Sequence, residues 1–293
     1  MATRVALVTG ASSGIGEATA RKLQSLGYLV YGAARRTDRL ENLSAHGIRA
    51  LAMDVTEDQS MQDGMAKIVA EAGRIDVLVN NAGYGSYGAL EDVAIEEARR
   101  QFEVNVFGAI RLTQLALPHM REQRSGTVVN ITSMGGKIHT PLGGWYHGTK
   151  FALEALSDCL RVEVAPFGID VVVIEPGGIA TEWGEIAANH LDDTPGTSAY
   201  QAQAAAVAKS LRSEMYTKRN SPPSVVADAV AKAGELALLL AGGDYLDDLT
   251  PRLAKALAAD LARLSRGAPV LGPSAPPAVP YPAPHTAAVV GHG

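Results

Sequence analysis

The chain has 293 residues, of which 47% are hydrophobic, and a formal net charge of −5. This composition can form a substantial core but lacks the clustered Lys and Arg residues that bind a nucleic-acid backbone, so we expect no nucleic-acid partner. The single cysteine, Cys159, excludes an internal disulfide; it lies in an apolar helical pattern, where we expect a buried thiol in a reducing compartment.

Short apolar runs rich in β-branched residues predict strands at residues 5–8, 29–31, 48–52, 77–79, 127–131 and 171–174. Helical patterns lie between most of these runs, and such alternation is typical of a parallel sheet. Because the runs lack alternating polar residues, we expect helices on both faces of the sheet. The predicted fold class is therefore α/β, a Rossmann-type doubly wound parallel sheet in a single domain over residues 1–240, with ligands beyond the carboxyl ends of its strands.

A glycine-rich turn, residues 9–16, joins the first predicted strand to a helical pattern. Glycines let the backbone approach a pyrophosphate closely, and the N-terminus of the helix attracts its charge. Such turns also occur as ordinary connections, but here the strand, the turn and the helix follow in the order that dinucleotide binding requires. The residues expected to contact the cofactor are Gly10, Ser12, Ser13, Gly14, Ile15 and Gly16.

Two arginines, Arg35 and Arg36, follow the second predicted strand, at the point where a carboxylate would accept a hydrogen bond from the ribose of NAD. Guanidinium groups favour a 2′-phosphate instead, so we expect NADP(H) to be preferred over NAD(H). The alternative is that both arginines are only solvated at a helix start. Asp38 is interpreted as the cap of the next helix rather than as a ribose ligand.

Polar residues also follow the third and fourth predicted strands. Asp54, before Val55, either accepts a hydrogen bond from the adenine amine or holds its own loop, and the first interpretation is preferred. The segment 80–83 brings backbone and side-chain amides beside the cofactor, through Asn81, Ala82 and Gly83. Asn105 lies in an otherwise apolar helix, where it needs specific hydrogen bonds and could hold a water.

Three residues are candidates for the reaction itself. Tyr146 and Lys150 are four residues apart at the start of a helical pattern, so their side chains lie on one face. An ammonium group there favours the tyrosinate and makes the phenol a usable acid or base at neutral pH. Ser133 follows the strand predicted at 127–131, so we expect its hydroxyl to reach the same crevice and bind a substrate carbonyl.

Together these motifs resemble the short-chain dehydrogenase/reductase family in its compact form, over roughly residues 1–240. The matching segments, in the order of the family, are Thr9–Gly16, Asp54–Val55, Asn80–Gly83, Asn105, Ser133, Tyr146–Lys150 and Pro176–Gly177 with Thr181. Residues 135–145 and 174–183 are also similar to members that act on hydroxysteroids, retinol and other alcohols or carbonyls. The resemblance implies an NAD(P)-dependent enzyme that acts on CH–OH groups.

The resemblance also implies a role for each candidate. Tyr146 is the catalytic acid/base, and Ser133 orients the carbonyl. Lys150 binds the nicotinamide ribose and lowers the pKa of the phenol, and Asn105 supports a proton-relay water. The loop after the last predicted strand is expected to contact the nicotinamide through Pro176, Gly177, Ile179 and Thr181. A homo-oligomer, either a dimer or a tetramer, is expected from the resemblance alone.

The reaction expected is NADP(H)-dependent interconversion of a secondary alcohol and a ketone or aldehyde on a moderately sized apolar substrate. Leu142, Trp145 and Trp183 either line the pocket or pack in the core, and residues 180–220 are expected to form a substrate lid. A cofactor-binding regulator without turnover is an alternative that the intact catalytic residues disfavour. A sugar-nucleotide epimerase is a further alternative, disfavoured by the spacing of the glycine-rich turn and the short chain after Pro176.

The C-terminal part departs from the family, which usually closes with a seventh strand. A helix capped by Ser221 is predicted, but no strand pattern follows Gly234. The pattern of residues 241–266 predicts a helical extension. Its basic residues are compatible with a membrane surface, but the preferred interpretation is that this helix docks on the domain of its own chain. Residues 267–293 are rich in proline and lack Asp, Glu, Lys and Arg, which predicts a disordered tail.

The remaining expectations concern location and metals. No apolar run is long enough to span a bilayer and no leader precedes the first strand, so we expect a cytoplasmic protein without a membrane partner. His119, His139 and His147 lack the spacing of a metal site, and we expect surface or loop positions for them.

Overall fold

The structure, a computed structural model, describes residues 3–35, 37–195, 197–213, 218 and 220–241. The sheet belongs to a compact unit that spans residues 1–238. Arg36, the predicted helical extension after residue 241 and the predicted tail at 267–293 lie outside the described residues.

Six strands form one parallel sheet, as the apolar runs predict. They are β1 Val5–Thr9, β2 Leu29–Ala34, β3 Arg49–Ala52, β4 Val77–Asn80, β5 Gly126–Ile131 and β6 Ile169–Ile174. Their order across the sheet is β3-β2-β1-β4-β5-β6, and all neighbouring strands run parallel. The chain reverses its direction of winding between β1 and β4, and ligands bind at such a switch point, beyond the carboxyl ends of the strands. The prediction of a Rossmann-type sheet is confirmed.

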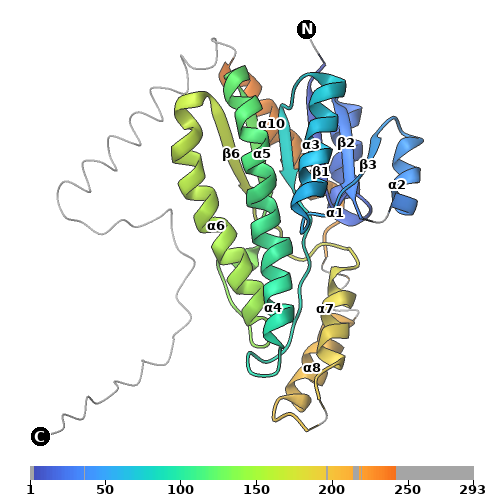
Figure 1. Ribbon diagram of the computed structural model, residues 1–293. Coiled ribbons are helices and arrows are strands. Elements are labelled where there is room, and N and C mark those ends of the chain that lie inside the picture. The colour runs from blue at the N-terminus through green and yellow to red at the C-terminus, as the bar shows by residue number, and fades with distance from the viewer. Residues whose placement is uncertain (1–2, 36, 196, 214–217, 219, 242–293) are drawn as a thin grey trace, which may run out of the picture. The chain divides into compact units, whose positions relative to one another are not determined.

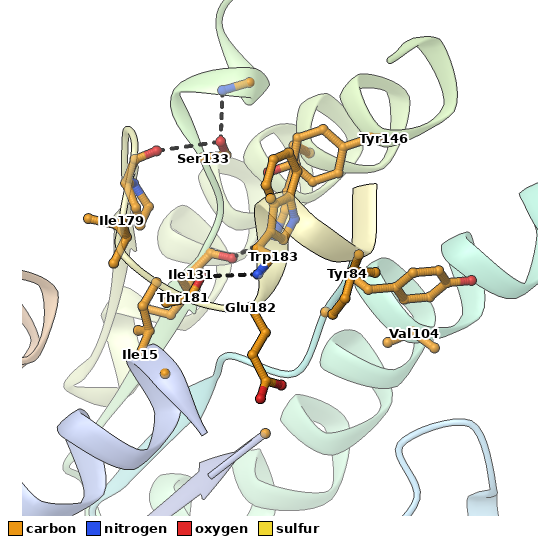
Figure 2. A pocket seen from close by; sticks show the side chains of 18 of the residues that line it. Ile15, Tyr84, Val104, Ile131, Ser133, Tyr146, Ile179, Thr181, Glu182 and Trp183 are labelled. Atoms are coloured by element: carbon orange, nitrogen blue, oxygen red, sulfur yellow. Dashed lines mark hydrogen bonds between the residues drawn. The ribbon is translucent and has the colours of Figure 1, made fainter. Parts of the chain in front are cut away.

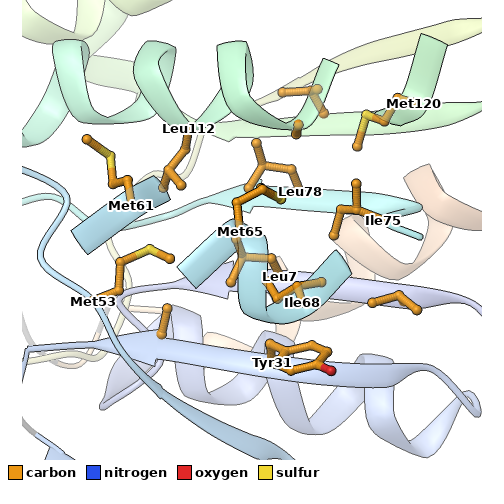
Figure 3. Close-up of a cluster of buried hydrophobic side chains, with 14 of the residues drawn as sticks. Leu7, Tyr31, Met53, Met61, Met65, Ile68, Ile75, Leu78, Leu112 and Met120 are labelled. Carbon is orange, nitrogen blue, oxygen red and sulfur yellow. The ribbon is translucent and has the colours of Figure 1, made fainter. Parts of the chain in front are cut away.

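One face of the sheet is covered by α3 (Asp58–Ala72), α5 (Gly108–Gln123) and α6 (Gly144–Val164). Figure 3 shows Met65 and Ile68 of α3 packed over Leu7 and Leu78 of the central strands. All four side chains are buried, and burying apolar surface of this kind is the main source of the stability of the fold.

The opposite face is covered by α1 (Gly14–Ser25), α2 (Thr37–Ser44) and α10 (Pro223–Ala241). Leu23 of α1, Leu43 of α2 and Val230 of α10 belong to one buried cluster with Val8 and Val79 of the sheet. Because helices bury both faces, the central strands are mostly apolar, which explains why the sequence shows no polar alternation.

Apart from a 3₁₀ turn that directly precedes β6, the remaining elements lie towards the carboxyl ends of the strands. Helix α4 (Ile95–Phe102) continues through a π-helical turn, η1 (Glu103–Phe107), into α5, and short 3₁₀ turns, η2 (Met134–Gly136) and η3 (Ala165–Phe167), flank α6. Helices α7 (Trp183–Asp192) and α8 (Gln201–Leu211) lie beyond the strand ends (Figure 1). The segment predicted as a lid therefore contains two packed helices.

The start of α10 differs from the sequence prediction. The helix begins at Pro223, and Ser221 is not its cap because this residue pairs with Ile179 in an isolated parallel bridge. The bridge joins the segment before α10 to the loop after β6. No helix of the described residues is long and apolar enough to cross a membrane.

Two side chains of α6 also differ from expectation. Cys159 is exposed rather than buried, because α6 carries apolar residues such as Phe151 and Leu156 on its exposed side as well. An apolar pattern in this helix therefore does not identify the buried face. His147, expected at the surface or in a loop, is buried in the first half of the helix, with 6% of its surface exposed.

Candidate active site

A cavity of about 1110 Å³ lies at the carboxyl ends of the strands and is lined from both halves of the sheet. Gly16 and Asn105, both predicted site residues, are not among its lining residues, and Arg36 lies outside the described residues. The other predicted residues all line this cavity, and they are Gly10, Ser12, Ser13, Gly14, Ile15, Arg35, Asp54, Val55, Asn81, Ala82, Gly83, Ser133, Tyr146, Lys150, Pro176, Gly177, Ile179 and Thr181.

The turn after β1 has the features that a pyrophosphate needs. Gly10 and Gly14 adopt φ angles of 65° and 57°, which residues with side chains rarely adopt. A Cβ atom on Gly16 would overlap the carbonyl oxygen of Gly10, so only glycine fits there. The side chain of Ser13 does not cap α1, which leaves the N–H groups of the first helical turn available to an anion.

Hydrogen bonds between the ends of β1 and β4 support this turn. Thr9 Oγ1 accepts from the backbone N–H groups of Asn81 and Ala82, both at 3.0 Å, and Asn81 Nδ2 donates to the Thr9 carbonyl oxygen at 2.9 Å. Asn80, the residue before, points into the core instead, where its amide donates to Asn130 Oδ1 at 2.9 Å. Of the two asparagines, only Asn81 lines the cavity.

Arg35 and Asp54 bound the cavity beside β2 and β3. Asp54 Oδ1 accepts from the backbone N–H and from Oγ1 of Thr56, at 3.0 and 2.8 Å, so this carboxylate holds its own loop. Nη1 of Arg35 lies 4.0 Å from the other carboxylate oxygen, and the arginine side chain is 61% exposed. The guanidinium group is therefore accessible to an anionic group of a ligand.

Ser133 follows β5 and lies beside the loop after β6. Its Oγ accepts from the backbone N–H of Gly135 at 2.9 Å and donates to the carbonyl oxygen of Pro176 at 3.4 Å. The hydroxyl thus links two neighbouring strand ends. Figure 2 shows Ser133, Tyr146 and Trp183 together at one end of the cavity, whereas Ile15 of the glycine-rich turn lies towards the other end.

Tyr146 and Lys150 lie one turn apart on α6, and each is 7% exposed. Nζ of Lys150 donates to the carbonyl oxygen of Ile131 at 3.0 Å. Burial lowers the pKa of Lys150 to about 8, and the negative charge of Glu154 opposes this shift. The amino group is held between the phenol ring and the end of β5, where its positive form favours a nearby phenolate.

Asn105 lies in the π-helical turn η1. Its Oδ1 accepts from the backbone N–H of Tyr84 at 3.0 Å, and its Nδ2 donates to the Tyr84 carbonyl oxygen at 2.9 Å and to Thr149 Oγ1 at 3.0 Å. This polar side chain therefore joins the loop after β4 to α6. It also lies next to the cavity, because a Cβ atom on Gly83 would be 3.0 Å from Asn105 Oδ1 and 3.8 Å from Lys150 Nζ.

Aromatic side chains surround Tyr146. The ring centre of Trp183 lies 5.2 Å from that of Tyr146, and the ring centre of Tyr87 lies 5.9 Å away. Trp183 lines the cavity, in agreement with the first of the two interpretations given for it. Leu142 and Trp145 do not line the cavity. The sequence analysis missed Tyr87; its position in the loop after β4, at the carboxyl end of a strand, is the signal that could have identified it.

Helices α7 and α8 bound the cavity near Tyr146. Ala187 and Leu191 of α7 and Ala204 of α8 pack in one buried cluster with Tyr146. Helical periodicity gave no indication of the side chains besides Trp183 that these helices present to the cavity, which are Glu185, Ile186, His190, Gln203, Val207 and Leu211. Ile186, Val207 and Leu211 form the apolar part of this wall.

Comparison with known proteins agrees with the geometry. Residues 4–191 match the family described as short chain dehydrogenase. The 3-ketodihydrosphingosine reductase of Bacteroides thetaiotaomicron is 42% identical over 181 residues, which cover 62% of this chain and 66% of that protein. The NADPH-dependent 3-dehydrocapnine reductase of Ornithobacterium rhinotracheale is 39% identical over 194 residues, which cover 62% of this chain and 68% of that protein.

A solved structure supports the same conclusion. A short-chain dehydrogenase from Streptomyces avermitilis superposes with a TM-score of 0.69 at 36% identity, and the match covers 90% of this chain and 98% of that one. The sheet order and the match over residues 4–191 thus agree. This chain belongs to the short-chain dehydrogenase/reductase family, a family of oxidoreductases that act on CH–OH groups.

Proposed function

We propose that this enzyme interconverts a secondary alcohol and a ketone or aldehyde on a moderately sized apolar substrate, with NADP(H) as its coenzyme. The observation that carries the proposal is the grouping of Ser133, Tyr146 and Lys150 at one end of a cavity whose other end is a glycine-rich turn suited to a pyrophosphate. When bound, the coenzyme supplies or accepts the hydride.

In the proposed reduction, the protein handles the carbonyl oxygen and the proton. The Ser133 hydroxyl donates a hydrogen bond to the carbonyl oxygen and holds it beside Tyr146. The Tyr146 phenol gives its proton to that oxygen, and the Lys150 ammonium group, with Nζ 5.9 Å from the ring centre, stabilises the resulting phenolate. Lys150 is also proposed to hold the nicotinamide ribose, and Asn105 to support a water that returns the proton.

NADP(H) is proposed as the preferred coenzyme for two reasons. Arg35 presents an exposed guanidinium group at the end of β2, and guanidinium groups bind phosphate oxygens in a bidentate manner. The residues before it, Ala33 and Ala34, offer no carboxylate to a ribose 2′-hydroxyl. The name of the Ornithobacterium relative, which describes that protein as NADPH-dependent, supports the same preference.

An apolar substrate is proposed because of the side chains near Tyr146. Trp183, Tyr87 and Ile186 line the cavity beside the phenol, and Val207 and Leu211 extend this wall along α8. Residues 180–220, which contain α7 and α8, are proposed to act as the substrate lid. Both relatives named above are reductases of compounds named as 3-keto or 3-dehydro derivatives, which supports a ketone as the reacting group.

A coenzyme and substrate panel tests the proposal. The purified protein is incubated with NADPH or NADH and with cyclohexanone, 2-decanone or 3-ketodihydrosphingosine, and coenzyme oxidation is followed. We expect ketone-dependent oxidation of NADPH, with kcat/KM at least about tenfold higher than with NADH, which corresponds to about 1.4 kcal/mol. Equal use of NADH would contradict only the coenzyme preference. No oxidation with any ketone, together with no reduction of NADP by the corresponding alcohols, would contradict the proposed reaction.

A further inference from the structure

The imidazole of His147, the residue after Tyr146, makes hydrogen bonds at both ring nitrogens. Nε2 lies 3.0 Å from the backbone nitrogen of Thr140, whose N–H points at it, and 3.0 Å from Thr140 Oγ1. Nδ1 lies 2.8 Å from the carbonyl oxygen of Gly135. Since a backbone N–H requires an acceptor, Nε2 carries no hydrogen, and Nδ1 of the neutral ring is the donor to Gly135.

His147 therefore holds the loop that connects Ser133 to α6. Gly135 lies in η2, just after Ser133, and Thr140 lies close to the start of α6. The ring fits closely between two glycines: a Cβ atom on Gly135 would be 3.1 Å from Nδ1, and one on Gly143 would be 2.9 Å from Nε2. Both ends of the loop are thus packed against one buried side chain.

Gly135 connects His147 to the proposed catalytic hydroxyl. Its carbonyl oxygen accepts from His147, and its N–H donates to Ser133 Oγ at 2.9 Å. Fixing the carbonyl fixes the backbone torsion angles of Gly135, and a glycine has unusual freedom in those angles. The N–H of Gly135 occupies one lone pair of the hydroxyl oxygen, and the hydroxyl hydrogen points to the carbonyl oxygen of Pro176 at 3.4 Å. The bond to Pro176 is long, so a substrate carbonyl can replace it while the bond from Gly135 keeps the oxygen in position.

We propose that His147, in its neutral form with hydrogen on Nδ1, is a positioning residue that orients the Ser133 hydroxyl through Gly135. The inference rests on the proposed role of Ser133 in carbonyl binding. It assigns to His147 no contact with the substrate and no proton transfer, only the holding of the hydroxyl oxygen in position. A held oxygen of this kind lowers the barrier because only the hydroxyl hydrogen has to turn, from Pro176 to the substrate carbonyl, when the substrate binds.

The tautomer of His147 can be measured without any activity. In long-range ¹H–¹⁵N correlation spectra of the ¹⁵N-labelled protein at neutral pH, we expect a protonated Nδ1 and an unprotonated Nε2. The signals are assigned to His147 by their loss in the His147→Asn variant, since the chain contains seven histidines. A hydrogen on Nε2, or on both nitrogens, would overturn the proposal whatever the reaction of the enzyme is.

The coupling to Ser133 is tested with two substitutions of equal size. In His147→Asn the side-chain amide retains a donor at the δ position for the carbonyl of Gly135, whereas His147→Leu has none. The assay uses NADPH and the ketone of the panel that is reduced fastest. We expect kcat to fall by about tenfold or more in the leucine variant and by about threefold or less in the asparagine variant. The difference is expected because only the leucine variant loses the bond to Gly135.

The same two variants in a Ser133→Ala background complete the cycle. If His147 acts through Ser133, the leucine and asparagine variants have similar kcat values once the hydroxyl is absent. NADPH affinity and the thermal midpoint are measured in every variant, and a difference in those quantities that matches the loss of kcat would indicate a merely structural role and overturn the proposal.

The cycle also separates the two levels of the argument. A large loss of kcat in Ser133→Ala, together with equal kcat values for His147→Leu and His147→Asn while Ser133 is present, would overturn the positioning role alone. Full turnover in Ser133→Ala would overturn the proposed role of Ser133 and, with it, the positioning of that hydroxyl by His147.

Discussion

The Nζ atom of Lys150 lies 5.9 Å from the centre of the Tyr146 ring, one helical turn further along α6. The amino group is buried and donates to the carbonyl oxygen of Ile131 at 3.0 Å. Removal from water disfavours the charged form, and this lowers the pKa of Lys150 to about 8. The fold therefore keeps beside the proposed acid/base a lysine that is mostly charged at pH 7 and loses its proton near pH 8.

This pKa predicts a pH-dependent cost to stability. Because the pKa in the folded state is lower than the ordinary value of 10.5, burying the charged lysine destabilises the fold fully below about pH 8. The cost disappears as the pH rises from about 8 towards 10.5, where the unfolded chain also loses the proton. Urea unfolding of the coenzyme-free protein and of Lys150→Met measures the effect.

The comparison across pH separates charge from packing. The loss of the hydrogen bond and the change in packing in Lys150→Met contribute similarly at each pH. We expect the stability of the variant relative to the natural protein to be highest at pH 7 and to decline towards pH 10. A difference that does not change with pH would contradict the burial of a charged group.

We expect opposite results when Gly16 and Gly148 are each replaced by alanine. At Gly16 the new methyl group would overlap the carbonyl oxygen of Gly10 and displace the glycine-rich turn. Because this turn is proposed to bind the pyrophosphate, Gly16→Ala should weaken NADPH binding by about tenfold or more. At Gly148, within α6, the nearest atom is Phe102 Cζ at 3.7 Å, so Gly148→Ala should stabilise the protein by roughly 0.5–1 kcal/mol.

Fluorescence titration with NADPH and urea unfolding check both variants. Gly148→Ala is the matched control, since it adds the same methyl group to another helix. Unchanged NADPH affinity in Gly16→Ala would mean that the turn does not receive the coenzyme.

A buried chain of amides in the sheet predicts a large loss of stability on substitution. Asn130 is fully buried in β5; it accepts from Asn80 at 2.9 Å and donates to Ser157 Oγ at 2.8 Å. Asn130→Ala removes one buried hydrogen bond from each of these partners, although Asn80 still donates to Thr113 and Ser157 to the carbonyl of Leu153. We expect a loss of about 2 kcal/mol or more in the free energy of unfolding. Gln62→Ala on the exposed side of α3 is the control and should change it by less than about 0.5 kcal/mol. Similar values for both variants would show that the amide chain contributes little.

We expect that replacing Arg35 changes the coenzyme preference. In Arg35→Ala, KM for NADPH should rise by about tenfold while KM for NADH stays nearly constant, because only NADPH carries the 2′-phosphate. Arg21→Ala is the control: its guanidinium pairs with Glu17 on α1 and does not line the cavity. Steady-state kinetics with both coenzymes give the answer, and an equal rise in both KM values would argue against a phosphate contact.

The sheet and most of the cavity could be predicted from the sequence because their signals are local. Each strand is a short apolar run, and residues that line the cavity follow it closely in the chain, as Ser133 follows β5 and Asp54 follows β3. A parallel sheet then brings these strand ends to one edge. The spacing of Tyr146 and Lys150 needs only the period of a helix.

The features that the sequence did not predict depend on packing between distant segments. Tyr87, from the loop after β4, and Trp183, at the start of α7, both meet Tyr146, and no local pattern in the sequence indicates these contacts. Thr56, two residues away, satisfies one carboxylate oxygen of Asp54 through its N–H and hydroxyl, which agrees with the loop-holding alternative for this residue. His147 is buried because η2 folds back over α6, and this contact spans twelve residues of the chain.

The central claim is that the Tyr146 phenol transfers the proton in an NADP(H)-dependent reduction, and Tyr146→Phe tests it most directly. The substitution removes one hydroxyl and keeps the ring against Trp183 and Tyr87. We predict that ketone-dependent oxidation of NADPH falls by about a hundredfold or more, as the loss of a general acid requires, while the dissociation constant of NADPH stays nearly the same. A Tyr146→Phe enzyme that reduces the ketone at the original rate would contradict the account.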